Sequence, residues 1–295
     1  MTVQTTLSKT LAQVEDFQLA ALFGLDGNAF GQAETHVVVP CYNEEQRLNG
    51  QKFVEFAAIN REIRFVFVDD GSTDGTLAVL ERLQRQMPDT FEVLALPRNT
   101  GKAEAVRAGL RHATERGASL VGYWDADLAT PLEAILDFSD IARRYRDVDV
   151  VFGSRMHLLG HRIRRTLARR AVSRICSGLA RLAVRLPVRD TQCGAKLLRN
   201  TPALRSSIAQ EFTAGWLFDV ELFARLSSRL GDRRMAFYEF PLAEWNEVTG
   251  SKVTARSIIG SGFKMLKLVV ESRWGRFPSK APGLSTTAEA ARRAA

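Results

Sequence analysis

The sequence has few of the residues that build disulfide frameworks or zinc sites. It contains three cysteines and four histidines in 295 residues. Cys41, Cys176 and Cys193 are widely spaced and form neither a CxxC pair nor a Cys/His zinc pattern. We therefore expect free thiols in a reducing compartment, and neither a disulfide-stabilised secreted domain nor a zinc protein.

Long apolar segments are missing as well. No uncharged run reaches the roughly 18 residues that a membrane-spanning helix needs. The N-terminus lacks the basic segment followed by an apolar run that marks a secretion signal. We expect a cytoplasmic protein without a transmembrane helix, which would act on a membrane only peripherally, from its cytoplasmic face.

Acidic residues are outnumbered by basic ones, which gives a formal charge of +8. An excess of positive charge favours an anionic partner, and nucleic acid, an anionic lipid surface and a phosphorylated substrate all fit. The hydrophobic content of 45% is that of a globular protein with a substantial core.

Short apolar runs alternate with segments of helical periodicity, which predicts βαβ units and an α/β fold with a mostly parallel central sheet. The predicted strands are 36–40, 64–69, 91–96, 119–124 and 149–153, with helices at 76–86 and 102–115. Further along we expect a basic helical segment from 157, a short strand at 195–198, a helix at 216–229 and a strand at 235–245.

Four regions are predicted along the chain. They are an N-terminal extension with the spacing of an amphipathic helix (1–33), the main domain (34–252), an amphipathic C-terminal segment (253–277) and a disordered tail (278–295). In parallel sheets ligands bind at the carboxyl ends of the strands. Polar clusters begin at such ends at Pro40, Asp69, Asn99 and Asp125, so we expect the ligand site there.

The cluster Asp125-Ala-Asp127 carries two carboxylates one residue apart. Two carboxylates at a strand end can share Mg²⁺ or Mn²⁺, because both ions prefer hard oxygen ligands. Such an ion would bind the two phosphates of a nucleotide sugar and neutralise the charge of the leaving diphosphate. The alternative is an ordinary polar turn.

Two other clusters permit a ligand and a local interpretation. In the first, the Tyr42 ring would stack on a base and Asn43 or Glu44 would bind ribose, or else Asn43 caps a helix. In the second, Asp69 and Asp70 would hydrogen-bond a base or ribose, or else they belong to a plain turn.

Taken in order, these clusters resemble the family 2 glycosyltransferases of the GT-A fold. The motifs that carry the resemblance are Pro40-Cys-Tyr-Asn-Glu44, Asp69-Asp-Gly-Ser-Thr-Asp-Gly75, Asn99-Thr-Gly-Lys102, Asp125-Ala-Asp127 and Gly153-Ser-Arg155. Similarity to the polyprenyl-phosphate glycosyltransferases, particularly the dolichyl-phosphate glucosyltransferase type, adds Asp190-Thr-Gln-Cys-Gly194, Gly215–Glu221 and Gly250-Ser-Lys252. The resemblance covers about residues 35–260.

The resemblance implies a role for each matching position. The nucleotide-sugar site would consist of Pro40, Tyr42, Asn43, Glu44, Asp70, Gly101, Lys102, Asp125 and Ala126. Asp127 would ligate the metal, and Arg155 and Arg169 would meet donor and acceptor phosphates. The catalytic set would be Asp125, Asp127, Arg155 and Asp219. Related enzymes often carry Gln two residues after the metal-binding Asp, where this chain has Ala129, which leaves the coordination set open.

The implied reaction is an inverting transfer of a hexose, glucose first and mannose second, from UDP-glucose or GDP-mannose to a polyprenyl or dolichyl-type phosphate. A phosphate oxygen is already anionic near neutral pH and needs little help from a base. A saccharide or other soluble hydroxyl acceptor, the alternative, would need a carboxylate base. Asp219 is the leading candidate for that base, and a plain helix-start residue is the other interpretation.

Two basic segments, 157–186 and 253–274, have apolar positions at helical spacing. Such helices can lie in an anionic membrane interface, or pack their apolar face onto the sheet. A nucleic-acid-binding protein is a different interpretation of the same charge. The acidic pairs at the strand ends disfavour it, so no specific nucleic acid is expected. An inactive scaffold is a third interpretation, disfavoured by the nearly complete set of motifs.

Overall fold

The computed structural model describes residues 34–156, 158–164, 178, 180–230, 234–246 and 266–272. The predicted N-terminal extension, the tail, half of the segment 157–186, most of the segment 253–274, Cys176 and Arg169 lie outside these residues. Within them, no helix combines the length and the apolar character needed to cross a membrane.

A seven-stranded sheet forms the centre of the domain, in the order β3-β2-β1-β4-β7-β5-β8. Its strands are β1 (Thr35–Cys41), β2 (Ile63–Asp69), β3 (Phe91–Ala95), β4 (Leu120–Trp124), β5 (Val150–Ser154), β7 (Ala195–Arg199) and β8 (Phe237–Pro241). All neighbours are parallel except β7, which runs antiparallel between β4 and β5. The mostly parallel sheet is therefore confirmed, and so are the predicted strands except the one at 235–245, which is divided into β8 and a separate strand, β9 (Glu244–Asn246).

The helices that accompany the sheet include α2 (Gly50–Ile59), α3 (Thr76–Gln86), α4 (Lys102–Glu115), α5 (Ala134–Arg144), α7 (Pro202–Ile208) and α8 (Phe218–Leu230). Two short 3₁₀ turns are η1 (Gly215–Leu217) and η2 (Arg234–Ala236). The predicted helices at 76–86, 102–115 and 216–229 are confirmed by α3, α4 and η1 with α8.

One helix start was predicted wrongly. Asn43 does not cap a helix, because residues 45–47 form a turn and α2 begins only at Gly50. The cap is Asn49, whose side chain accepts a hydrogen bond from the backbone N–H of Lys52 at 3.3 Å. Both asparagines precede the same helical pattern, and only the folded loop distinguishes them.

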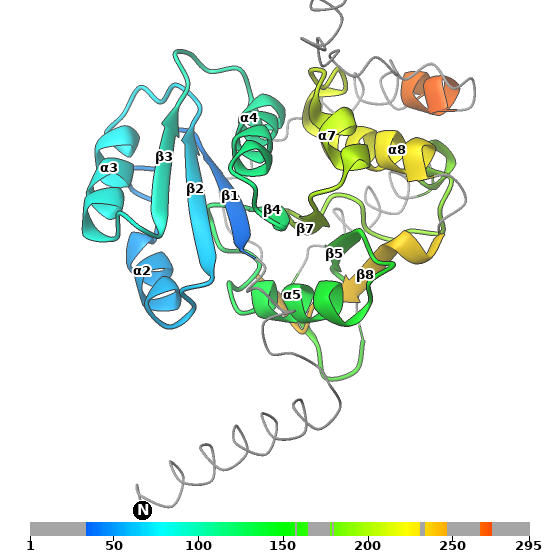
Figure 1. Ribbon diagram of the computed structural model, residues 1–295, viewed down its shortest axis with the longest axis horizontal. Coiled ribbons are helices and arrows are strands. Elements are labelled where there is room, and N and C mark those ends of the chain that lie inside the picture. Colours follow the sequence, from blue (N-terminus) through cyan, green and yellow to red (C-terminus); the bar gives the residue numbers. More distant parts are fainter. Residues whose placement is uncertain are drawn as a thin grey trace, which may run out of the picture. The chain divides into compact units, whose positions relative to one another are not determined.

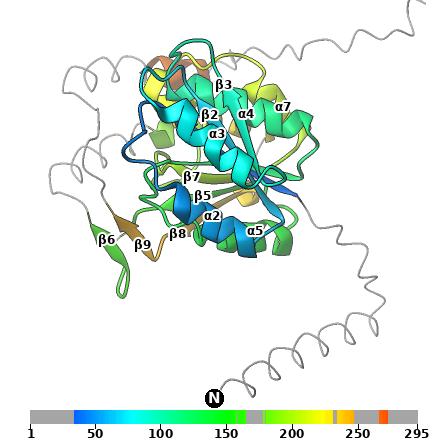
Figure 2. The same cartoon turned by 90° about the vertical axis from the view of Figure 1, so that its left-hand side faces the viewer.

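The basic segment from 157 is also not helical where the structure describes its start. Arg162–Arg164 is strand β6, which pairs in parallel with β9 (Glu244–Asn246) in a separate two-stranded sheet (Figure 2). The N–H of Arg162 donates to the carbonyl of Ala243 at 2.8 Å. A partner about 80 residues away in sequence decides the conformation, and periodicity within the segment cannot reveal it.

Apolar side chains cover both faces of the sheet. Along β1 the side chains alternate, since Val38 belongs to one buried cluster and Val37 and Val39 to the other. The first cluster includes residues of α4, α7 and α8, and the second includes residues of α2, α3 and α5. Figure 2 shows α4 and α7 above strands β7 and β5, and α2 and α5 below these two strands. The sheet therefore has two cores, and its carboxyl-end edge remains for the polar loops (Figure 1).

Candidate active site

A cavity of about 410 Å³ opens at the carboxyl ends of β1 and β2. It is lined by Pro40, Cys41, Tyr42, Glu44, Arg47, Asp70, Asn99, Gly101, Lys102 and Ala105. Six of the nine residues predicted to bind the nucleotide sugar are in this lining. Asn43, Asp125 and Ala126 are not, although Lys102 connects the cavity to Asp125. Sequence analysis missed Arg47 and Ala105, and it included Cys41 and Asn99 only as parts of motifs without assigning them to the site.

The carboxylate of Asp70 orders the loop in front of α4. It accepts hydrogen bonds from the backbone N–H of Thr100 at 2.8 Å, from the Thr100 hydroxyl at 2.9 Å and from the N–H of Gly101 at 2.8 Å. Gly101 has φ of +94°, a conformation that favours glycine. Asp70 therefore places the first residue of α4, Lys102, beside the cavity.

The loop after β1 is tied to the loop after β2. The carboxamide of Asn43 accepts a hydrogen bond from the N–H of Thr73 at 2.9 Å, and its own N–H donates to the Ser72 hydroxyl at 3.0 Å. The N–H of Glu44 donates to the Thr76 hydroxyl at 2.8 Å. Asn43 therefore holds two strand-end loops together, which leaves Tyr42 and Glu44 to face the cavity.

Asp125 lies at the end of β4, beside β7. Its N–H donates to the carbonyl of Gly194 at 3.0 Å, and its carboxylate forms an ion pair with the ammonium of Lys102. A side chain at position 194 would collide with the Asp125 carboxylate. Gly194 is thus needed for the carboxylate to occupy this place.

Asp127 is half-buried and follows Asp125 in a tight turn. Its Oδ1 accepts a hydrogen bond from the N–H of Ala129 at 3.1 Å, and Leu128 between them has φ of +52°. Burial, and next the charge of Asp125, raise the pKa of Asp127 above its ordinary value. A cation bound between the two carboxylates would relieve this repulsion.

The two carboxylates fit a divalent cation. Ala129 is buried in the apolar cluster and offers no side-chain oxygen. Among the described residues, no group of three or more Asp, Glu, His or Cys side chains could hold a metal ion. Mg²⁺ and Mn²⁺ usually complete their shell with water and substrate phosphate oxygens, so two carboxylates suffice.

Lys102 supplies positive charge at the same point. Burial lowers the pKa of its ammonium, but the carboxylates of Asp125, Asp219 and Asp127 outweigh this effect, and the pKa is raised above its ordinary value. The group therefore stays charged near neutral pH, where it can bind a phosphate.

Arg155, just after β5, is fixed by Asp190. Its Nε lies 2.6 Å and a terminal guanidinium nitrogen 2.8 Å from the two carboxylate oxygens, and its backbone N–H donates to Asp190 at 3.1 Å. The guanidinium also lies over the Trp245 ring, 5.2 Å from its centroid. This bidentate geometry orients a guanidinium well.

Glu239 of β8 supports that arrangement. Its carboxylate accepts hydrogen bonds from the Ser154 hydroxyl at 2.8 Å, from the N–H of Asp190 at 2.8 Å and from the N–H of Arg189 at 3.0 Å. Sequence analysis included Asp190 only as part of a motif and missed Glu239. A lone glutamate in an apolar strand gives no sequence signal beyond its unexpected polarity.

Asp219 lies at the start of α8 and is almost completely buried. Its Oδ1 accepts a hydrogen bond from the Nζ of Lys196 at 2.6 Å and another from the Tyr123 hydroxyl. Lys196 is fully buried and also donates to the Cys193 carbonyl at 2.6 Å. Burial and the Asp219 charge raise the pKa of Tyr123 well above its ordinary value, so the phenol remains a donor. Asp219 therefore balances a buried ammonium.

The comparison with known families agrees with these motifs. Residues 36–205 match the model described as "Glycosyl transferase family 2". The chain belongs to this family. It is 35% identical over 241 residues to the dolichyl-phosphate beta-glucosyltransferase of Drosophila melanogaster, an alignment that covers 75% of this chain and 69% of the relative. It is 26% identical over 250 residues to the polyprenol monophosphomannose synthase of Mycolicibacterium smegmatis, covering 82% and 89%.

The fold of this glycosyltransferase is similar to that of solved enzymes. Glucosyl-3-phosphoglycerate synthase from Mycobacterium tuberculosis, in complex with Mn²⁺, UDP-glucose and phosphoglyceric acid, aligns with a TM-score of 0.58 and 19% identity, over 88% of this chain and 86% of that one. Together with the family match, this confirms the predicted GT-A fold and the predicted enzyme class.

Proposed function

We propose that the protein transfers a hexose, with inversion, from a nucleotide-diphosphate donor to the phosphate of a polyprenyl or dolichyl-type lipid. The observation that carries the proposal is the convergence of Asp125, Asp127 and Lys102 beside a cavity that the nucleotide motifs line. The names of the family relatives point to the lipid phosphate as acceptor.

The donor would enter the cavity at the ends of β1 and β2. There Tyr42 would stack on the base, and Glu44 and the ordered loop at Asp70 would hold the ribose. UDP-glucose is our first choice, because the relative with 35% identity is named a glucosyltransferase. GDP-mannose is the second, because of the mannose synthase relative.

Asp127, together with Asp125, would hold Mg²⁺ or Mn²⁺ against the donor diphosphate. A divalent ion there supplies Lewis-acid neutralisation of the leaving group. Lys102 would add a second positive charge, and Arg155 and Arg169 would bind phosphates of donor and acceptor. Charge stabilisation at fixed positions would then carry most of the catalysis.

The state of Asp219 favours a phosphate acceptor over a hydroxyl acceptor. A hydroxyl needs a base with a lone pair directed at it, whereas one oxygen of Asp219 is occupied by Lys196 and Tyr123. An acceptor phosphate oxygen, already anionic, would attack the anomeric carbon. The bond between that carbon and the nucleoside diphosphate would break at the same time. A single displacement gives a β-linked product from an α-linked donor.

The acceptor would place the enzyme at the cytoplasmic face of a membrane, as a peripheral protein. The exposed Leu182, Leu266 and Val270, in the two segments predicted to touch lipid, support this location.

A transfer assay tests the reaction. Purified protein would be incubated with UDP-glucose or GDP-mannose, a short polyprenyl phosphate, and Mn²⁺, Mg²⁺ or a chelator. We expect a glycosyl lipid from one donor, and none in the chelator. Nucleotide binding without a lipid product would refute the lipid acceptor, and product with a soluble alcohol instead would identify a hydroxyl acceptor. No binding of either donor would refute the whole proposal.

A further inference from the structure

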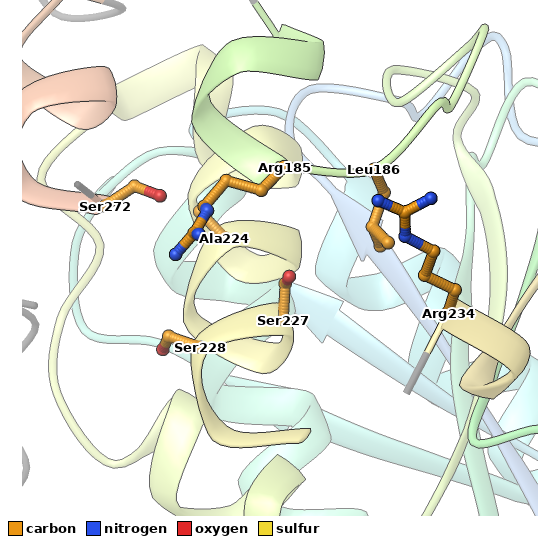
Figure 3. A pocket seen from close by; sticks show the side chains of 7 residues that line it. All are labelled: Arg185, Leu186, Ala224, Ser227, Ser228, Arg234 and Ser272. Carbon is orange, nitrogen blue, oxygen red and sulfur yellow. The ribbon is translucent and has the colours of Figure 1, made fainter. Parts of the chain in front are cut away.

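A second cavity lies beside α8 and shares no lining residue with the first. It has a volume of about 240 Å³ and is lined by Arg185, Leu186, Ala224, Ser227, Ser228, Arg234 and Ser272 (Figure 3). Its residues come from the end of a helical turn at 180–184, from α8, from η2 and from the helical residues 266–272. It thus lies where the two basic segments predicted to touch a membrane meet α8.

The lining offers hydrogen-bond donors and no carboxylate. In the view of Figure 3 the side chains of Arg185 and Arg234 lie on either side of the Ser227 hydroxyl, and the Ser272 hydroxyl points toward Arg185. Guanidinium groups only donate, and hydroxyls donate readily. A ligand for this cavity must supply several acceptor oxygens and negative charge, as a phosphate does.

The two arginines are available to a ligand. In the part of the chain that the structure describes, the side chains of Arg185 and Arg234 are exposed and make no ion pair, like those of Arg61 and Arg82, whereas Arg107, Arg155 and Arg225 each pair with an acid. Arg185 also has φ of +60° where it ends its helical turn. Glycine or asparagine is the usual residue there, so the backbone does not explain an arginine at this position.

Exposed apolar side chains adjoin the cavity-lining residues in the sequence. Leu182 lies one turn before Arg185, Met235 follows Arg234, and Leu266 and Val270 precede Ser272. Their exposed fractions lie between 45% and 77%. Leu266 and Val270 are four residues apart and share one helix face, while Leu268 and Ser272 are buried on another. They are four of the eight exposed large hydrophobic residues recorded among the described residues.

We propose that this cavity binds the headgroup phosphate of an anionic phospholipid, with the four apolar side chains entering the membrane interface around it. Phosphate-binding arginines beside exposed apolar groups match both parts of such a lipid. The proposal rests on the proposed membrane location, and not on the identity of the donor or acceptor. It assigns lipid binding to a defined cavity with Arg185 and Arg234, and not to positive charge spread over the surface.

Vesicle co-sedimentation tests the site. The full-length protein would be mixed, at one ionic strength, with vesicles of phosphatidylcholine alone or of phosphatidylcholine with an equal amount of phosphatidylglycerol. The variant is Arg185→Gln with Arg234→Gln. The matched control is Arg61→Gln with Arg82→Gln. Arg61 follows α2 and Arg82 lies on α3, both are exposed, and the two substitutions remove the same amount of charge.

We expect the wild type to bind the phosphatidylglycerol vesicles and the cavity variant to bind them about 30-fold more weakly, at about fivefold for each arginine. The control pair should lose about threefold or less. Leu266→Ser with Val270→Ser should also weaken binding. Equal losses in the two arginine pairs would overturn the proposal, since they would indicate only diffuse charge attraction.

Two further arms separate the remaining outcomes. Glycerophosphate added in excess over lipid should not release the protein, and release to the level of the cavity variant would identify a free-phosphate site instead. Transfer to a short water-soluble polyprenyl phosphate should be unchanged in the cavity variant. Vesicle binding that depends on Arg185 and Arg234, in a protein that transfers no sugar, would support this site and refute the proposed function.

Discussion

Two acidic pairs stand at the carboxyl ends of two strands on either side of β1, Asp69 with Asp70 at the end of β2 and Asp125 with Asp127 after β4. The first pair is buried, with 3% and 2% of its surface exposed. Its oxygens accept hydrogen bonds from the N–H groups of residues 72, 100 and 101. The Asp125 side chain, in contrast, is 32% exposed. It forms an ion pair with the ammonium of Lys102, whose side chain is 46% exposed.

The comparison teaches that the same sequence signal serves two purposes. Backbone N–H groups occupy three of the four oxygens of the first pair, and Asp69 Oδ1 is buried without a hydrogen-bond partner among the described residues. These carboxylates order the loops that shape the cavity. The second pair keeps oxygen atoms for a ligand, and the raised pKa of Asp127 marks charge that the protein itself leaves uncompensated. Substitutions in the two pairs should therefore affect different properties of the enzyme.

The largest effect is expected for Asp127→Asn. Turnover should fall by about 10³-fold, because the variant lacks the carboxylate charge that is proposed to hold the metal ion against the donor diphosphate. The melting temperature should change little, since the amide oxygen can still accept from Ala129. Transfer assays and thermal melts measure both. Asp140→Asn, on the exposed face of α5, is the control and should be active. Unfolding of the Asp127 variant would instead indicate that Asp127 has a structural role, like that of Asp69 and Asp70.

Gly194→Ala should act through Asp125. The added methyl group displaces the carboxylate, and a displacement of about 1 Å at a catalytic group can reduce the rate about 10²-fold. Gly178→Ala, where a methyl group meets nothing within 4 Å, is the control. Kinetics at saturating donor would measure the loss. Full activity would show that the position of Asp125 is not critical.

Asp70→Asn should reduce stability rather than chemistry. The new amide NH₂ would face a backbone N–H that now donates to the carboxylate, and such a mismatch in a buried site costs about 2 kcal/mol. Urea denaturation should show this loss, about 30-fold in the unfolding equilibrium. A variant with normal stability and a raised KM for the donor would instead place Asp70 in direct contact with the nucleotide.

Asp190→Asn tests a third carboxylate. Like Asp70, Asp190 accepts hydrogen bonds at both oxygens, but its donors include the side chain of Arg155. Arg155 would lose the negative charge of its ion-pair partner, and we expect about a tenfold loss in kcat/KM for the acceptor with little change in the donor's KM. Glu239→Gln, one step further away, should lose less. Equal loss for both substrates would indicate a purely structural role.

The smallest expected effect concerns pH. The folded-state pKa of Asp127 is raised by burial and Asp125, so its contribution to stability is present below the ordinary pKa and is lost as pH rises through the folded value. Metal affinity should run the other way and fall as acid protonates Asp127. In Asp127→Asn the rise in stability toward acid pH should be smaller than in the wild type, by urea titration. An unchanged profile would contradict the assigned shift.

Much of the fold followed from local patterns. The apolar runs at 36–40 and 64–69 became β1 and β2, because a strand buried on both faces reads as a continuous apolar run. Pro40, Tyr42, Glu44, Asp70, Gly101 and Lys102 met in one cavity, because parallel strands end at one edge. The same local logic failed at Asn43 and at Arg162–Arg164, where the partner lies far along the chain.

The sequence by itself determined the strands, the helices, the family and the edge of the sheet that carries the site, since each depends on neighbouring residues or on motifs in order. Tertiary structure alone decided which carboxylates are occupied. Asp190 meets Arg155 across 35 positions, Glu239 meets Asp190 across 49, and Asp219 meets Lys196 across 23. A carboxylate's role depends on the donors around it, and folding brings those donors from distant parts of the chain.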